Sequence, residues 1–166
     1  MPISELLLPE FDAEMKSTRT MLERVPFDKQ GYAPHAKSMK LDKLAGHVAE
    51  LPGFGASILT TPELNFDGGA RPQIPFESAA LLKIFDETAA KTRTALQSVS
   101  DQAWLENWKL TFKGMPVFSG QRFLAYRQMF LNHLVHHRAQ LGVYLRLNDR
   151  PLPATYGPSA DDKMGF

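Results

Sequence analysis

The segment GQRFLAYRQMFLNHLVHHRAQLGVYLRL, Gly120–Leu147, is the longest helical pattern in the chain. Its apolar residues recur at spacings of three and four, which is the period of an amphipathic helix. Ser119 precedes the segment and is a suitable N-cap, while Asn148 and Pro151 should end the helix. The sequence therefore predicts one long helix here.

This helix is apolar on more than one side. At about 100° per residue, one side should face the core, and it carries Phe123, Tyr126, Phe130, Leu134, Leu141 and Tyr144. One flank carries Leu124, Leu131 and Val135, and the other flank carries Met129, Val143 and Leu147. A helix that is apolar nearly all round is buried on several sides or joins subunits together. We therefore expect a homodimer.

Three histidines crowd into the run NHLVHHR at Asn132–Arg138. His137 falls near the middle of the core side and His133 lies one turn before it, whereas His136 points to a flank. A single inward histidine is usually a hydrogen-bonded core residue. Two buried imidazoles need several polar partners, and a shared metal ion satisfies one nitrogen of each. The pair therefore indicates a metal site.

Two further residues belong to this hypothesis. The spacing of the His133–His137 pair is also that of zinc metalloproteases, but Leu134 stands where those enzymes have glutamate, which argues against a protease.

His47, in the run LAGHVAE, is the candidate third ligand. Glu50 follows on nearly the same side and is either a further ligand, a partner of a ligand, a catalytic base or an ordinary solvated carboxylate. His35 follows Pro34 and is expected to belong to loop structure.

The rest of the chain predicts three more helices. Apolar stripes place them at about Ser4–Arg24, Leu41–Leu51 and Phe76–Gln97. Pro52 and Gly53 should interrupt the second helix, and one or two further turns are expected at Phe54–Thr60. Four helices joined by moderate loops indicate an all-α, four-helix bundle.

The connections are predicted as loops and one small hairpin. Gly31–Lys40 and Thr61–Pro75 are expected to be loops, and Ser100 to cap a short turn. Trp104–Phe118 alternates apolar and polar residues around Gly114, which predicts a small β-hairpin before the last helix. The tail, Pro151–Phe166, should be irregular.

The composition is that of a single globular domain spanning residues 1–166. With 19 basic and 18 acidic residues, the net charge of +1 offers no attraction for nucleic acid or an anionic membrane. No stretch reaches the roughly 18 apolar residues of a membrane span, and Met1–Pro9 does not resemble a signal peptide. The chain has no cysteine, which excludes thiolate ligands and a cysteine nucleophile. We expect a cytoplasmic protein.

Two stretches resemble the DinB/YfiT-like superfamily of metal-dependent proteins, which is unrelated to the DNA polymerase of similar name. They are YAPHAKSMKLDKLAGHVAEL at Tyr32–Leu51 and NHLVHHRAQLGVYLRLNDRPLPATYGP at Asn132–Pro158. The resemblance implies a four-helix bundle of up-down-down-up topology that often dimerises. It also implies a divalent metal ion (zinc, nickel or iron) held by His47, His133 and His137.

Three functions are expected as alternatives for such a site, and the resemblance implies the first. The first is transfer of a low-molecular-weight thiol, such as bacillithiol, mycothiol or glutathione, to an electrophilic small-molecule substrate. Three protein ligands leave a coordination position open for the thiol, and a metal ion favours the reactive thiolate form. The second is a hydrolase in which the metal activates water and Glu50 is the base. The third is a stress protein that binds metal or ligand without catalysis. A di-iron centre fits poorly because the last helix has no inward glutamate.

Overall fold

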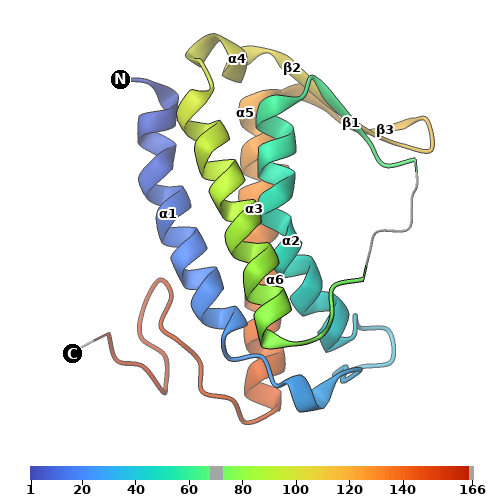
Figure 1. Cartoon of the computed structure of the whole chain (residues 1–166), viewed down its shortest axis with the longest axis vertical. Coiled ribbons are helices and arrows are strands. Elements are labelled where there is room, and N and C mark those ends of the chain that lie inside the picture. Colours follow the sequence, from blue (N-terminus) through green and yellow to red (C-terminus); the bar gives the residue numbers. More distant parts are fainter. Residues whose placement is uncertain (68–72, 165–166) are drawn as a thin grey trace.

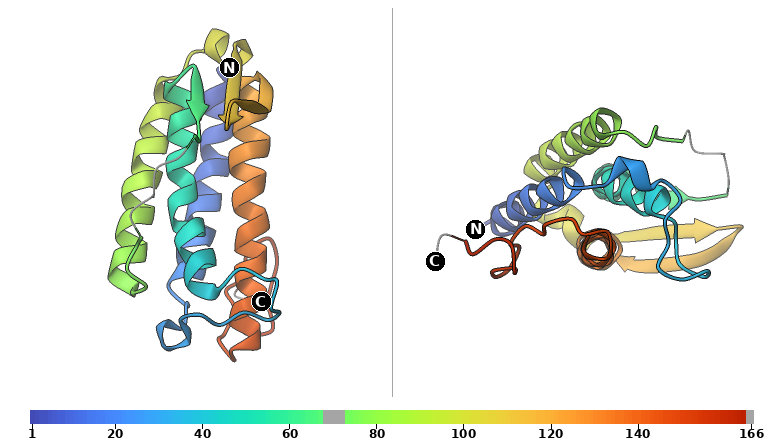
Figure 2. Two further views of the ribbon diagram at one scale, coloured as in Figure 1. Left: turned by 90° about the vertical axis from the view of Figure 1, so that its right-hand side faces the viewer. Right: turned by 90° about the horizontal axis from the view of Figure 1, so that it is seen from below.

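The computed structural model describes residues 1–67 and 73–164. Its long helices lie side by side (Figure 1, Figure 2). They are α1 (Ile3–Leu22), α2 (Leu41–Thr60), α3 (Ser78–Ser98) and a closing run of α5 (Arg122–Ala125), η2 (Tyr126–Leu131) and α6 (Asn132–Leu147). In Figure 1, α1 and the closing run descend, whereas α2 and α3 ascend. The predicted mostly helical fold is confirmed, and apart from the end of α2 the helix ends lie within a few residues of those expected. Short connections are η1 (Phe27–Lys29) and α4 (Asp101–Leu105).

Helix α2 differs from the prediction because it continues through Pro52 and Gly53 to Thr60. A proline inside a helix costs about 3 kcal/mol through its missing N–H and its ring. Burial outweighs that cost here, since Pro52 is itself buried and Ile58 is fully buried beyond it. The Thr92 hydroxyl of α3 also donates to the Pro52 carbonyl.

The predicted hairpin is present but belongs to a three-stranded sheet. Strands β2 (Asn107–Phe112) and β3 (Met115–Gln121) are antiparallel, and their turn uses positive φ at Lys113 and Gly114. Strand β1 (Glu63–Asn65) pairs with β2 in parallel. The expectation that the whole stretch from Thr61 to Pro75 is a loop was therefore wrong, because a three-residue strand is too short to show an alternating pattern.

The closing helix begins later than predicted. Ser119 and Gly120 belong to β3, so Ser119 is not the N-cap and α5 starts at Arg122. The run then passes through a π-helical stretch, η2, before α6. Arg122 is buried and donates to the carbonyls of Ala103 and Thr61 at 3.1 and 2.7 Å, which holds the helix start against α2 and α4. The predicted cap at Ser100 is confirmed, since its hydroxyl accepts the Ala103 amide at 3.2 Å.

The core lies between the long helices and beneath the sheet. Its largest fully buried side chains are aromatic, and they are Phe11, Phe85, Trp104, Trp108, Tyr126 and Phe130. Helix α2 packs against both α3 and α6. Among the described residues, no helix has both the length and the apolar character needed to span a membrane.

Candidate metal centre

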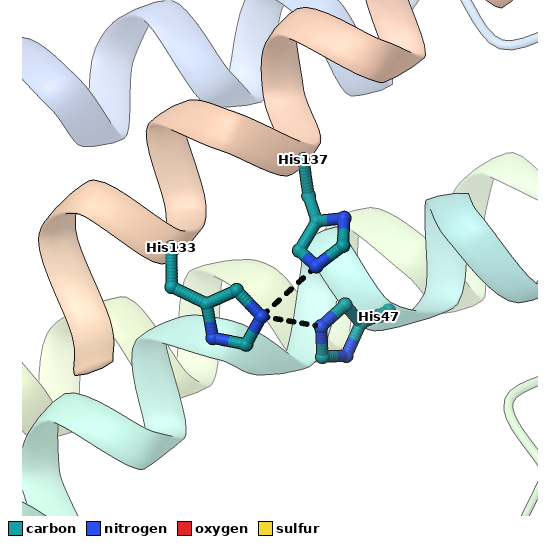
Figure 3. Close-up of side chains that lie close together, drawn as sticks. All are labelled: His47, His133 and His137. Atoms are coloured by element: carbon teal, nitrogen blue, oxygen red, sulfur yellow. Dashed lines mark hydrogen bonds between the residues drawn. The ribbon is translucent and has the colours of Figure 1, made fainter. Parts of the chain in front are cut away.

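Two helices bring three histidines together. His47 lies in the first half of α2, and His133 and His137 lie one turn apart on α6. Figure 3 shows the three rings pointing toward one another across the α2–α6 contact. All three side chains are half-buried. These are the three positions that helix phase and the family resemblance indicated from the sequence.

The three rings face one another through the same type of atom. The His133 Nε2 lies 3.3 Å from the Nε2 of His47 and 2.9 Å from the Nε2 of His137. One potential ligand atom from each ring lies within 4.8 Å of the others. Ligand atoms that share a tetrahedral zinc ion at about 2.0–2.1 Å are about 3.3 Å apart, so the spacing of the three nitrogens suits one small divalent ion.

Hydrogen bonds on the far side of the rings fix which nitrogen is free to bind. The Nδ1 of His133 lies 3.2 Å from the Met129 carbonyl, which can only accept, so this Nδ1 carries the proton. The Nδ1 of His137 lies 2.7 Å from Oε1 of Gln140, and with the amide in this orientation the ring donates its proton to that oxygen. Both Nε2 atoms then present lone pairs. Lone pairs that face each other at 2.9 Å repel unless a cation lies between them.

Metal-binding histidines usually have this second hydrogen bond, because it fixes the tautomer and the orientation of the ring. The donor set is three neutral imidazoles, which suits zinc, nickel, iron or copper. The residues present therefore fit a divalent metal ion, and they leave part of its coordination sphere to an exogenous ligand.

The surroundings keep these imidazoles neutral. Burial lowers the pKa of His133, and the neighbouring His137 lowers it further. Burial also lowers the pKa of His137, although its hydrogen bond to Gln140 opposes this shift. Since a protonated imidazole cannot bind a metal, both shifts favour binding at neutral pH.

Two cavities meet at α2 beside the histidines. The first has a volume of about 380 Å³ and mixed polar walls, which include Gln30, Asp42, Lys43, Gly46, Gln73 and Phe76. The second has a volume of about 490 Å³ and mainly apolar walls. His47 and Glu50 line both cavities, and His133 lines the second. The structure thus places Glu50 in the walls of both cavities together with His47, where a carboxylate can accept a proton from a molecule bound there.

The remaining histidines and the nearby arginine lie outside the cluster. His35 is exposed in its loop, where its Nδ1 accepts the Lys37 amide at 3.1 Å. His136 is exposed, and its ring packs edge-on against His137 with the ring centres 4.8 Å apart. Arg138 is buried on the other side of α6, where it forms an ion pair with Glu14.

Sequence reasoning missed the partners of the ligands and the walls of the cavities. Met129 precedes His133 by four residues and Gln140 follows His137 by three, so helical spacing alone could have pointed to both. The apolar cavity had no such signal. Its aromatic wall pairs Phe54 of α2 with Phe66, which follows the unpredicted strand β1.

Fold and site together define a mostly helical protein with an open cluster of three histidines that could hold a divalent metal ion. The chain belongs to the DinB family, whose sequence model matches residues 1–164. No curated protein matches the sequence.

Two solved structures share the fold. A DinB-like protein from Bacillus cereus superposes with a TM-score of 0.69 at 19% identity, covering 93% of this chain and 98% of its own. A DinB-like protein from Bacillus subtilis gives a TM-score of 0.65 at 18% identity, covering 87% of this chain and 92% of its own. At this identity, the likeness extends to the fold alone.

Proposed function

We propose that His47, His133 and His137 bind one divalent metal ion, and that the protein uses it to join a low-molecular-weight thiol to an electrophilic small molecule. The observation that carries the proposal is the pair of cavities that meet at His47 and Glu50. A transferase must hold two substrates at one centre, whereas a hydrolase needs one substrate and water. The mixed polar walls of one cavity suit a hydrophilic thiol, and the apolar walls of the other suit the electrophile.

The chemistry follows from the residues around the centre. The chain has no cysteine, so a sulfur nucleophile must come from outside. A bound divalent ion would supply a positive charge that lowers the pKa of a thiol in its open position. Glu50 accepts the thiol proton, directly or through water, the sulfur electron pair forms the new bond to carbon, and the leaving group departs with the electron pair of the bond that breaks. Met129 and Gln140 hold His133 and His137 in the tautomer that this requires.

The runner-up is a metal-dependent hydrolase, and the position of Glu50 favours it. A carboxylate beside the centre is the base that activation of water needs. The third alternative, a stress protein that binds metal or ligand without catalysis, shares the site but not the chemistry.

The wider arrangement is also a proposal. We propose that α1, α2, α3 and the closing run form the four-helix bundle of up-down-down-up topology that the family resemblance implies. We further propose that the protein is a homodimer and that it acts in the cytoplasm on a small molecule.

Metal content tests the first part of the proposal. Untagged protein incubated with zinc, nickel or iron should bind about one equivalent per chain, measured by elemental analysis. The His133→Ala, His137→Ala double variant should bind none, whereas His136→Ala, the matched histidine on the same helix, should bind as wild type does. Folded wild type that stays metal-free with all three metals would overturn the proposal.

Activity tests the second part. Metal-loaded wild type should deplete a mixture of glutathione and chlorodinitrobenzene faster than the double variant does. Glu50→Gln should keep the metal but lose about 10²-fold or more in rate, as expected on removal of a general base. Hydrolysis of an ester without thiol would favour the hydrolase, and metal binding with neither reaction would favour the binding protein.

A further inference from the structure

The apolar cavity beside the histidines is assembled from distant parts of the chain. Its volume of about 490 Å³ lies within the roughly 300–1,000 Å³ typical of small-molecule sites. Helices α2 and α3, the sheet and η2 contribute its walls, which include Phe54, Leu64, Phe66, Ile84, Leu110 and Met129. The Phe54 and Phe66 rings lie 5.9 Å apart and present an aromatic surface.

The hydroxyl groups in this cavity already have partners in their own helices. The Ser57 hydroxyl donates to the Gly53 carbonyl at 3.2 Å, and the Thr88 hydroxyl donates to the Ile84 carbonyl at 2.7 Å. Within the described part of the chain, the lining includes no lysine or arginine. A polar or anionic ligand body would therefore lose its hydration without gaining partners. An apolar body would gain about 25 cal/mol per Å² that it buries.

The cavity is polar at one end. Along α2 its lining runs from His47 and Glu50 to Ser57, a rise of about 15 Å at 1.5 Å per residue. His133 lines the same end as His47, because the Nε2 atoms of the two rings are 3.3 Å apart. A molecule with an apolar body and one polar, reactive end matches this distribution.

We infer that this cavity binds the apolar body of the electrophile, an aromatic or aliphatic group of small-molecule size, with its reacting atom directed at the histidines. The inference rests on the proposed function only in naming the ligand as the electrophile. The binding itself needs neither thiol nor turnover.

Nuclear magnetic resonance can locate the binding, because the chain has two tryptophans in different surroundings. The Trp108 ring lies edge-on to Phe54 with the centres 6.1 Å apart, so its indole N–H signal should shift when the cavity fills. The Trp104 ring packs against Phe123 and Tyr126, which do not line the cavity, so its signal is the internal reference. The probe is 2-naphthol, titrated into the zinc-supplied full chain.

Cavity-filling variants test the position of the ligand. Ser57→Phe should weaken naphthol binding tenfold or more, because the new ring occupies the cavity. Ser98→Phe is the matched control, because Ser98 lies exposed on α3. Like the Ser57 hydroxyl, the Ser98 hydroxyl donates to the carbonyl four residues earlier in its own helix. Ile84→Phe, from the opposite wall, is the second variant if Ser57→Phe does not fold.

Saturable binding that shifts the Trp108 signal, survives Ser98→Phe and is lost in a cavity variant supports the inference. No shift at Trp108, equal shifts at both indoles, or unchanged affinity in the cavity variant overturns it. This result is separate from the proposed function. Naphthol binding in a protein without thiol transfer would leave the inference standing alone, whereas thiol transfer without naphthol binding would refute only the inference.

Discussion

At the scale of single residues, the protein resolves a conflict between burial and polarity. Half-buried imidazoles must remain neutral and must also satisfy both ring nitrogens. His133 does so by donating to a carbonyl of its own helix, at Met129, which leaves its Nε2 lone pair directed at the other two rings. The ligand geometry is therefore fixed by backbone as much as by side chains.

This arrangement predicts how zinc affinity depends on pH. The pKa values of His133 and His137 lie below the ordinary value of 6.5, chiefly because of burial. At these two ligands, protons therefore compete with zinc once the pH falls below about 6.5 and through the lowered pKa values. Zinc affinity, measured by competition with a chelating dye, should be flat from about pH 8 to 7 and should fall on further acidification. A steady decline that begins at about pH 8 would contradict the prediction.

The residue-level site was largely predictable. Helix phase separated His133 and His137 from His136 because these two are the histidines of the run HLVHH that fall on or near the core-facing side of the helix. His47 was harder, since one inward histidine on a second helix has no spacing signal of its own. His47 and His133 are separated by 86 positions in the sequence. Their contact depends on how α2 packs against α6, which the local sequence pattern does not specify.

At the scale of elements, two glycines of α2 have opposite roles. A Cβ at Gly55 would lie 2.8 Å from the Phe130 ring and 2.8 Å from Thr92 Cγ2, so Gly55 lets α2 approach its neighbours closely. A Cβ at Gly46 would meet only Ile74 Cδ1, at 4.0 Å. Of these two positions, only Gly55 needs the missing side chain for packing.

We predict that Gly55→Ala destabilises the protein by about 1–3 kcal/mol through overpacking, despite the better helix propensity of alanine. Gly46→Ala should instead stabilise it by roughly 0.5–1 kcal/mol, because the gain in propensity is not opposed. Denaturant unfolding of the two variants beside wild type measures both values. Equal effects of the two substitutions would show that the close approach at Gly55 is unimportant.

A second prediction at this scale concerns the tail after α6. Arg146 lowers the pKa of Asp161, as does the Leu152 amide, which donates to Asp161 at 2.8 Å. Amides of Met164 and Ala154 lower the pKa of Asp162. In the folded protein these pKa values lie below the ordinary 3.8, so the ionised carboxylates stabilise the tail at pH values above 3.8. This stabilisation should be lost as the pH falls through the lowered pKa values.

Hydrogen exchange measures this loss. The Leu152 and Ala154 amides should lose protection below about pH 4, relative to the intrinsic exchange rate, before the amides of α2 do. Asp161→Asn, Asp162→Asn should already be unprotected there at neutral pH. Tail amides that stay protected in this variant would show that other contacts hold the tail.

Two of the elements that escaped prediction share a physical cause. Pro52 predicts a break, yet tertiary burial on both sides of it keeps α2 continuous. Strand β1 has three residues and pairs with the edge that β2 offers. In both cases a long-range contact decides a local conformation. The π-helical stretch η2 contains no glycine or proline that would predict it from the sequence.

At the scale of the whole molecule, the helix directions place the site. Helices α2 and α6 pack together and run in opposite directions in Figure 1, so the first half of α2 meets the C-terminal part of the closing run. The sheet contributes Leu64 of β1 and Leu110 of β2 to the walls of the apolar cavity. The mostly helical class was predictable from periodicity, whereas the cavity was not, because its walls come from several elements.

The outer face of α6 leads to the last prediction, which concerns assembly. Val143 and Leu147 lie one turn apart and are 56% and 54% exposed in the single chain. Such an exposed apolar pair is more stable when a second copy of the chain covers it.

Light scattering should therefore give about twice the chain mass of 18.6 kDa, and the double variant Val143→Glu, Leu147→Glu should give the single-chain mass. Leu105→Glu, at an equally exposed leucine on α4, should leave the dimer intact. Wild type that runs as a single chain at all concentrations would refute the dimer, and dissociation by Leu105→Glu would place the interface elsewhere.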